Sequence, residues 1–235
     1  MRDGARPALR PERAPQWLRP LIAAVRDVDA AMLSRHRIPP PAGGRRAAVL
    51  VLFGEDTQHG PDVLLMQRAS TMRDHAGQVA FPGGGADPGD ADAVATALRE
   101  AEEETGLDPA GVVPLALLPE LFIPPSGFVV RPVVAHWARP STVHAADPAE
   151  TAAVARVPLA ALADPANRLQ VTHPSGYIGP AFAVAGLVVW GFTGGILSAL
   201  LHLGGWERPW DHGRVHGLDD AWAAVRAARQ EVAGS

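Results

Sequence analysis

The order of apolar and polar residues along the chain predicts a mixture of strands and helices. Apolar runs rich in valine and leucine predict buried strands at 47–53, 62–68, 112–118, 129–137 and 181–190. Apolar spacing and helix-ending residues predict helices at 17–35, 92–105, 158–163, 193–203 and 218–232. Strands dominate the middle of the chain and helices its ends. We therefore expect an α/β (α+β) fold in which helical layers enclose a mixed, partly antiparallel central sheet.

The helix expected at 92–105 has well-defined ends. Asp90 and Asp92 are both favourable N-caps because their side chains can accept hydrogen bonds from the free N–H groups of the first turn. Gly106 is a favourable C-cap because glycine adopts left-handed backbone angles easily. Between these ends, helical spacing predicts a buried stripe formed by Val94, Ala97, Leu98 and Ala101.

Three glutamates gather beside this stripe. Glu100, Glu103 and Glu104 lie within about a third of the helix circumference, whereas Glu102 points away from them. Clustered carboxylates repel one another, and the repulsion is relieved by raised pKa values, by solvent or by a bound hard cation. An isolated charge run is usually a solvated surface. The three glycines at 83–85 favour the metal site instead, because they let the backbone approach phosphate or metal closely.

The glycines and the acidic helix together closely resemble the Nudix box, G-x5-E-x7-R-E-U-x-E-E-x-G-U, in which U is apolar. The second half of the box matches residues 99–107, Arg-Glu-Ala-Glu-Glu-Glu-Thr-Gly-Leu. The first half departs from it. A register led by Gly85 places Ala91 in the first acidic position, whereas one led by Gly84 places Asp90 there with a spacer of eight residues. We prefer the register with Asp90.

A second motif lies just upstream of the box. From Leu64 the chain reads LLMQRASTMRDHAGQVAFPGG, which is similar to L-L-T-x-R-[SA]-x3-R-x3-G-x3-F-P-G-G of the Nudix coenzyme A pyrophosphatases. Arg68, Arg73 and the Phe-Pro-Gly-Gly segment match, and Met66 replaces the threonine. Two motifs at a fixed mutual spacing are far more specific than either alone.

The resemblance implies a Nudix α/β/α sandwich and a Mg²⁺- or Mn²⁺-dependent hydrolase. The implied reaction cleaves the diphosphate of coenzyme A to 3′,5′-ADP and 4′-phosphopantetheine. Glu100 and Glu104 would be the primary metal ligands, with Glu103 a further ligand or the base that takes a proton from water. Glu150, in a later loop, is a second candidate base. Arg99 is expected to orient a ligand carboxylate through a salt bridge.

The expected substrate-binding residues are Arg68, Arg73, Gly83 and Gly84. Guanidinium groups suit bidentate contact with phosphate, such as the 3′-phosphate of coenzyme A. Two other functions stay open: a Nudix hydrolase of ADP-ribose, NADH or a nucleoside triphosphate, and a catalytically silent nucleotide-binding regulatory module. The upstream motif argues against the first and the complete set of acids against the second. The sequence has no phosphate-loop, serine-hydrolase or zinc-pair motif.

Composition indicates one catalytic domain with extensions. The chain of 235 residues is 47% hydrophobic and has no cysteine, which excludes thiol catalysis and disulfides. We expect a basic arm with one helix at 1–44, the Nudix domain at 45–204 and, at 205–235, a tail with a tryptophan-rich turn packed on the core and a short helix. The arginines of the arm are dispersed, so we expect its helix to dock on the domain and not to bind nucleic acid.

An uncharged segment at 181–201 is long enough for a membrane span. Four glycines interrupt it, so we expect a buried strand and a packed helix there instead, and no membrane contact. The chain does not open on a signal-peptide pattern, which favours a cytoplasmic enzyme of small-molecule substrates. The helix at 218–232 is amphipathic, and contact in a homodimer is one possible use of it.

Overall fold

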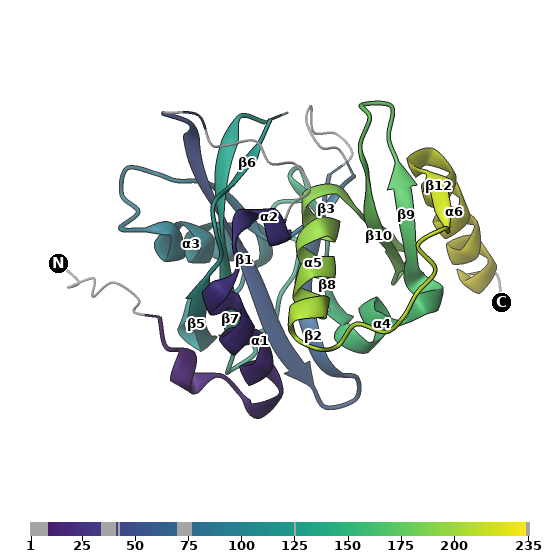
Figure 1. The fold of residues 1–235 in the computed structure, drawn as a ribbon. Coiled ribbons are helices and arrows are strands. Elements are labelled where there is room, and N and C mark those ends of the chain that lie inside the picture. Colours follow the sequence, from purple (N-terminus) through teal and green to yellow (C-terminus); the bar gives the residue numbers. More distant parts are fainter. Residues whose placement is uncertain (1–8, 34–40, 42, 70–76, 125, 234–235) are drawn as a thin grey trace.

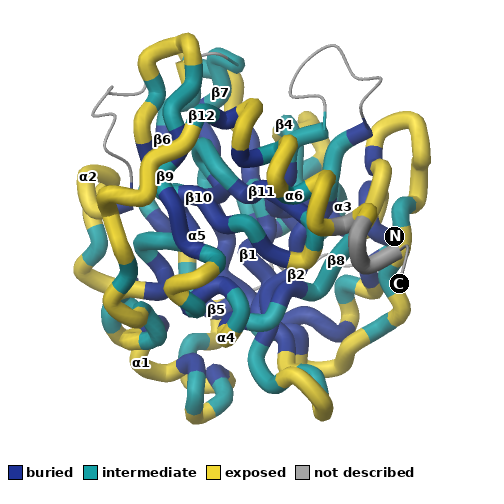
Figure 2. The backbone as a smooth tube through the Cα atoms, turned by 90° about the vertical axis from the view of Figure 1, so that its right-hand side faces the viewer, coloured by how far each residue is buried: buried dark blue, intermediate teal, exposed yellow. Residues whose placement is uncertain are grey.

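The chain folds into two sheets with helices packed on them, as seen in a computed structural model that describes residues 9–33, 41, 43–69, 77–124 and 126–233 (Figure 1). This mixed α+β arrangement confirms the expected fold class. The longest strands run through the buried centre of the molecule, and exposed residues gather on the helices and loops around them (Figure 2).

The larger sheet has eight strands and carries the residues of both motifs. Its main order is β3-β2-β1-β7-β5, with β4 paired to β1, β6 to β7 and β8 to β2. Among the described strands of this sheet, only β1 and β7 pair in parallel, so the sheet is mixed and largely antiparallel. Its strands are β1 (Arg45–Asp56), β2 (Gly60–Arg68), β3 (Val79–Ala80), β4 (Gly83–Gly85), β5 (Val112–Leu117), β6 (Leu121–Ile123), β7 (Phe128–Trp137) and β8 (Thr151–Pro158).

A smaller sheet of four strands lies beside the larger one, in the order β11-β10-β9-β12. It consists of β9 (Arg168–Thr172), β10 (Ile178–Val184), β11 (Leu187–Val189) and β12 (Val215–Gly217). The last of these comes from the C-terminal segment, which therefore completes this sheet. The division of the chain into arm, domain and tail stays a prediction.

Helices pack on both faces of the larger sheet and on both faces of the smaller sheet. They are α1 (Arg19–Ala24), α2 (Ala30–Leu33), α3 (Ala93–Thr105), α4 (Leu159–Ala163), α5 (Gly191–Leu203) and α6 (Leu218–Ala233). Short 3-10 turns lie at Pro11–Arg13, Gln16–Leu18, Val25–Asp27, Pro109–Gly111 and Pro165–Asn167. Alternate residues of β1 point to opposite faces, so Leu50 packs with α3 whereas Val51 packs with α1 and α5. A strand buried on both faces reads as one apolar run, as β1 does.

The single helix expected at 17–35 is wrong over the described residues. Val28 has extended backbone angles (φ −77°, ψ 130°), which end the first helical stretch. The Asp29 carboxylate then accepts a hydrogen bond from the N–H of Met32 and starts α2. The expected docking is confirmed, because Leu18 and Leu21 are buried in the main core.

The strand expected at 181–190 is also wrong, because the segment is the β10–β11 hairpin. Ala185 and Gly186 both have positive φ values, 53° and 71°, and form the two-residue turn between the strands. Positive φ is uncommon at alanine, so the residue type did not indicate a turn. Among the described residues, no helix is long and apolar enough to cross a membrane. The cytoplasmic location stays a prediction.

The tryptophan-rich turn packs on the core as expected. The Trp206 ring lies 6.0 Å from that of Phe53 and 6.1 Å from that of Trp17, between ring centroids. The side chain of Arg168 is fully buried, and its guanidinium carbon lies 4.6 Å from the centroid of the Trp210 ring. The Trp206 contacts fasten the segment after α5 to the larger sheet, and the Trp210 contact fastens it to the smaller sheet.

Candidate active site

Helix α3 holds the acidic cluster, and its ends form as expected. The Asp92 carboxylate accepts hydrogen bonds from the N–H groups of Val94 and Ala95, at 2.9 and 3.0 Å. Gly106 has left-handed angles and donates its N–H to the Glu102 carbonyl. The apolar stripe of the helix packs on the face of β1 that includes Leu50. This packing sets the acidic side of α3 against the glycine strand β4.

Glu104 lies at the centre of the cluster and is 9% exposed. Its Oε2 accepts a hydrogen bond of 2.8 Å from the N–H of Gly83. Burial raises the pKa of the Glu104 carboxyl to about 7, an effect that the Gly83 hydrogen bond opposes and the charges of Glu100 and Glu150 increase. A carboxylate this buried is costly to keep ionised without a nearby cation.

Glu100 faces the same strand one residue further along. A Cβ atom on Gly84 would come within 2.5 to 2.7 Å of the Glu100 carboxylate, so a side chain there would displace that carboxylate. Burial also raises the pKa of Glu100, whereas Arg99 lowers it. The absence of side chains on β4 therefore allows the carboxylate to lie directly against the backbone.

Arg99 joins the glycine strand to the acids. Its Nη2 donates to the Gly85 carbonyl at 2.9 Å, and its Nη1 lies 3.0 Å from oxygens of both Glu100 and Glu103. Asp90 holds the other edge of the guanidinium through hydrogen bonds of 3.0 and 3.1 Å. Asp90 is thus an ion-pair partner of Arg99, and the register that places it in the first acidic position of the box stays a prediction.

Sequence reasoning missed a third member of this clamp. The hydroxyl of Thr96, buried in α3, donates a 2.9 Å hydrogen bond to Oδ2 of Asp90. This contact fixes an aspartate that is shorter than the glutamate of the box pattern. A buried threonine inside a helix, four residues after the N-cap, was the available signal.

Replacing Asp90 by asparagine should weaken the fold and remove part of its acid sensitivity. Arg99 holds the pKa of Asp90 at about 2, below its ordinary value of 3.8. This ion pair contributes stability above about pH 4 that is lost as the pH falls towards 2. We expect Asp90→Asn to lower the free energy of unfolding at pH 7 by about 1 kcal/mol, and by less at pH 2. Urea unfolding between pH 2 and 7 measures both values.

Asp87→Asn is the matched control for this change. Asp87 is 68% exposed and lies 4.0 Å from Arg99, at the limit of an ion pair. Its replacement should leave the pH dependence unchanged. Equal effects of the two substitutions would contradict a specific clamp by Asp90.

The remaining predicted residues lie at different distances from the buried acids. Arg68 reaches the cluster, with Nη1 3.9 Å from Oε1 of Glu104. Glu103 is 58% exposed and contacts the cluster through Arg99. Glu150 is exposed, and its main-chain carbonyl accepts a hydrogen bond from Ala69, next to Arg68. Arg73 lies outside the described residues.

The donor set fits a hard divalent cation. Glu100 and Glu104 supply carboxylate oxygens beside a strand without side chains, where a Cβ atom would fill the space. Mg²⁺ typically takes one or two carboxylates and keeps several waters, so a complete protein cage is not required. The described residues contain no group of three or more acidic, histidine or cysteine side chains placed to hold a metal ion, so Glu103, the expected third ligand, does not join Glu100 and Glu104.

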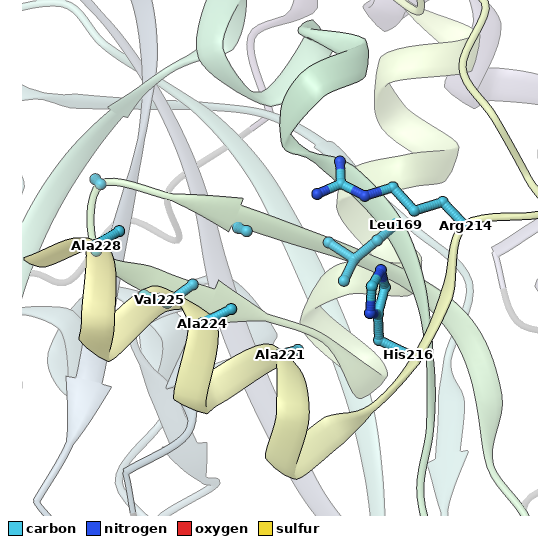
Figure 3. A pocket seen from close by; sticks show the side chains of 10 residues that line it. Leu169, Arg214, His216, Ala221, Ala224, Val225 and Ala228 are labelled. Atoms are coloured by element: carbon cyan, nitrogen blue, oxygen red, sulfur yellow. The ribbon is translucent and has the colours of Figure 1, made fainter.

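A cavity of about 610 Å³ lies away from these acids, between α6 and the smaller sheet (Figure 3). Alanines of α6 line one side of it and Leu169 the other, with Arg214 and His216 at one end. Neither Glu100 nor Glu104 lines this cavity. The acidic site is therefore separate from it.

Comparison with known proteins identifies the family. A model of the NUDIX domain matches residues 43–176, more than half of the chain. The chain belongs to the Nudix family. As a Nudix hydrolase, the protein is a pyrophosphohydrolase of phosphorus-containing anhydrides that acts on nucleoside diphosphate derivatives. Nudix hydrolases generally use divalent metal ions such as Mg²⁺ or Mn²⁺.

Several Nudix proteins are similar to this chain. "Uncharacterized Nudix hydrolase NudL" from Klebsiella aerogenes is 50% identical over 95 residues, which are 40% of this chain and 77% of that protein. The protein of the same name from Escherichia coli (strain K12) is 40% identical over 163 residues, 66% of this chain and 81% of that one. Among solved structures, the Nudix hydrolase RenU from M. smegmatis is 20% identical with a TM-score of 0.46, covering 73% of this chain and 92% of its own. An Ap4A hydrolase from C. elegans in a binary complex is 23% identical with a TM-score of 0.41, covering 48% and 80%.

Proposed function

We propose that the protein hydrolyses the diphosphate of coenzyme A, or of its derivatives, to 3′,5′-ADP and 4′-phosphopantetheine. The main observation behind this proposal is that Nη1 of Arg68 lies 3.9 Å from Oε1 of Glu104. Arg68 belongs to the upstream motif and Glu104 to the box, so the two motifs meet at one site. The upstream motif is the part of the sequence that favours coenzyme A over other nucleoside diphosphates.

Glu100 and Glu104 are the residues that would hold Mg²⁺ or Mn²⁺. When bound, such an ion neutralises charge on the diphosphate and lowers the pKa of a water ligand. Gly83 and Gly84 present bare backbone to the substrate, and Arg68 binds a diphosphate oxygen. Arg99 keeps the Glu100 carboxylate in place through its contacts with Asp90 and the Gly85 carbonyl.

Two glutamates can take the proton from the attacking water. Glu103 is on α3 and is tied to Arg99, at 3.0 Å. Glu150 is close enough for its charge to raise the pKa of Glu104. The structure supports both candidates, and the kcat values of Glu103→Gln and Glu150→Gln distinguish them, because loss of the base lowers kcat more than KM changes.

The proposal is tested by incubating the purified protein with Mg²⁺ or Mn²⁺ and a substrate panel. The panel contains coenzyme A, acetyl-coenzyme A, coenzyme A disulfide, ADP-ribose and NADH, and mass spectrometry identifies the products. We expect 3′,5′-ADP from the coenzyme A compounds at the highest kcat/KM. Preferred cleavage of ADP-ribose or NADH would overturn the substrate assignment, and no cleavage of any compound would favour a silent module.

A further inference from the structure

An arginine stacked on a phenylalanine lies at the end of the larger sheet where β1 and β7 begin. Arg45 and Phe128 are paired residues of these parallel strands. The guanidinium carbon of Arg45 lies 4.1 Å from the centre of the Phe128 ring, and Nη2 donates a 3.0 Å hydrogen bond to the Ser126 carbonyl. A stacked guanidinium with one N–H bound to the backbone is held in a defined orientation.

This pair lies next to the glycine strand of the candidate active site. Gly85 pairs with Ala47 of β1, and a Cβ atom on Gly85 would lie 3.7 Å from the Phe128 ring. Gly84 pairs with the next residue of β1 and points to the other face of the sheet, where it meets Glu100. The acids and the Arg45–Phe128 pair therefore flank β4 on opposite faces. No side chain of β4 separates them, because its three residues are all glycine.

Arg45 forms no ion pair with an acidic side chain within the described part of the chain. None of the ion pairs found there includes Arg45, whose side chain contacts only an aromatic ring and a carbonyl. The residue is exposed. Arg131, further along β7, differs because Glu120 pairs with it at 3.0 Å. A fixed, exposed and unpaired guanidinium is suited to a phosphate oxygen.

We propose that Arg45, oriented by Phe128, binds a second phosphate of the substrate, a phosphomonoester on the nucleoside part. This inference rests on the proposed function, because coenzyme A carries such a group as its 3′-phosphate. Arg68 lies against Glu104 and is placed for the diphosphate. Arg45 supplies a cation on the other side of β4, where a second phosphate of the same substrate would reach it. Arg45 is a specificity-determining residue that discriminates coenzyme A from dephospho-coenzyme A.

The first experiment compares coenzyme A and dephospho-coenzyme A as substrates of the wild-type protein and of Arg45→Gln. A charge-assisted hydrogen bond lost to solvent lowers affinity about ten-fold. We expect Arg45→Gln to raise KM for coenzyme A about ten-fold, with kcat nearly unchanged and dephospho-coenzyme A unaffected. Phe128→Leu should give a smaller loss in the same direction, because Arg45 remains but is no longer held by the ring.

Arg139→Gln is the matched control, because Arg139 is an exposed arginine beyond the opposite end of β7 that also donates to a backbone carbonyl, that of Ala110. Arg139→Gln should leave KM and kcat unchanged for both substrates. Equal losses on both substrates in Arg45→Gln, or no loss on either, would overturn the assignment. Thermal unfolding of each variant shows whether a loss comes from misfolding.

A binding measurement separates this inference from the proposed reaction. Calorimetry without metal compares 3′,5′-ADP with 5′-AMP, which lacks the 3′-phosphate. We expect the wild-type protein to prefer 3′,5′-ADP about ten-fold and Arg45→Gln to lose that preference. If coenzyme A is not cleaved but this preference depends on Arg45, the proposed reaction fails and the phosphate site stands. If coenzyme A is cleaved and the preference is absent or survives in Arg45→Gln, the phosphate site fails alone.

Discussion

Replacing Glu104 by glutamine should abolish most of the hydrolysis while making the metal-free protein more stable. The substitution removes a proposed metal ligand, and we expect kcat/KM to fall at least about a hundred-fold. The amide oxygen can still accept the hydrogen bond of Gly83. Burial raises the pKa of Glu104 to about 7 from 4.5, so the ionised form destabilises the fold. The gain in the free energy of unfolding on replacement by glutamine should grow between about pH 4.5 and 7 and then level off at about 2 kcal/mol.

Turnover assays and urea unfolding at several pH values test the two halves of this prediction. Glu102→Gln is the control, because Glu102 is exposed on the same helix and points away from the cluster. It should change neither activity nor stability. Wild-type turnover in Glu104→Gln would contradict the site assignment. A Glu104→Gln protein whose free energy of unfolding is lower than that of the wild type by the same amount at every pH would contradict the claim that the ionised carboxylate destabilises the fold.

Replacing Gly83 by alanine should damage both the fold and the site. Gly83 has a φ of 154°, which residues other than glycine rarely adopt. A Cβ atom added there would meet the carbonyl of Ala48 and the Cα of Val49. Relief requires β4 to move away from β1. We expect a loss of about 3 kcal/mol in the free energy of unfolding. Activity should fall as well, because the displaced N–H no longer holds Glu104.

Gly89→Ala is the matched control for this substitution. A Cβ atom on Gly89 has no neighbour within 4 Å, and Gly89 lies between the same strand and the same helix. Thermal unfolding and kcat/KM should be unchanged in this variant. A Gly83→Ala protein with wild-type stability and turnover would show that β4 does not need glycine at that position.

The acidic helix was predictable from the sequence because its signals are local. Asp92, Gly106 and the apolar stripe act within a few residues of one another, and helical periodicity alone places Glu100 and Glu104 on one side. The long strands β1, β2 and β7 were predictable for a similar reason. A strand buried on both faces is a continuous apolar run.

The elements that the sequence did not predict have weak local signals. The segment of β8 includes three alanines, which have low strand propensity, and it forms a strand because β2 pairs with it. The smaller sheet joins β9 to β12, which lie more than forty residues apart in the chain. Such a pairing depends on the position of α6 and leaves no pattern in either segment.

By itself, the sequence predicted the composition of the candidate site, namely the glycines, the acids and the three arginines of the motifs, and it indicated the family. The tertiary structure decided how they act, because burial and long-range contacts depend on packing between distant segments. Packing of α3 against β4 buries Glu104 and raises its pKa. It also places Asp90 against Arg99. The parallel pairing of β1 with β7 sets Arg45 on Phe128. These residues are 83 positions apart, and only the folded sheet brings them together.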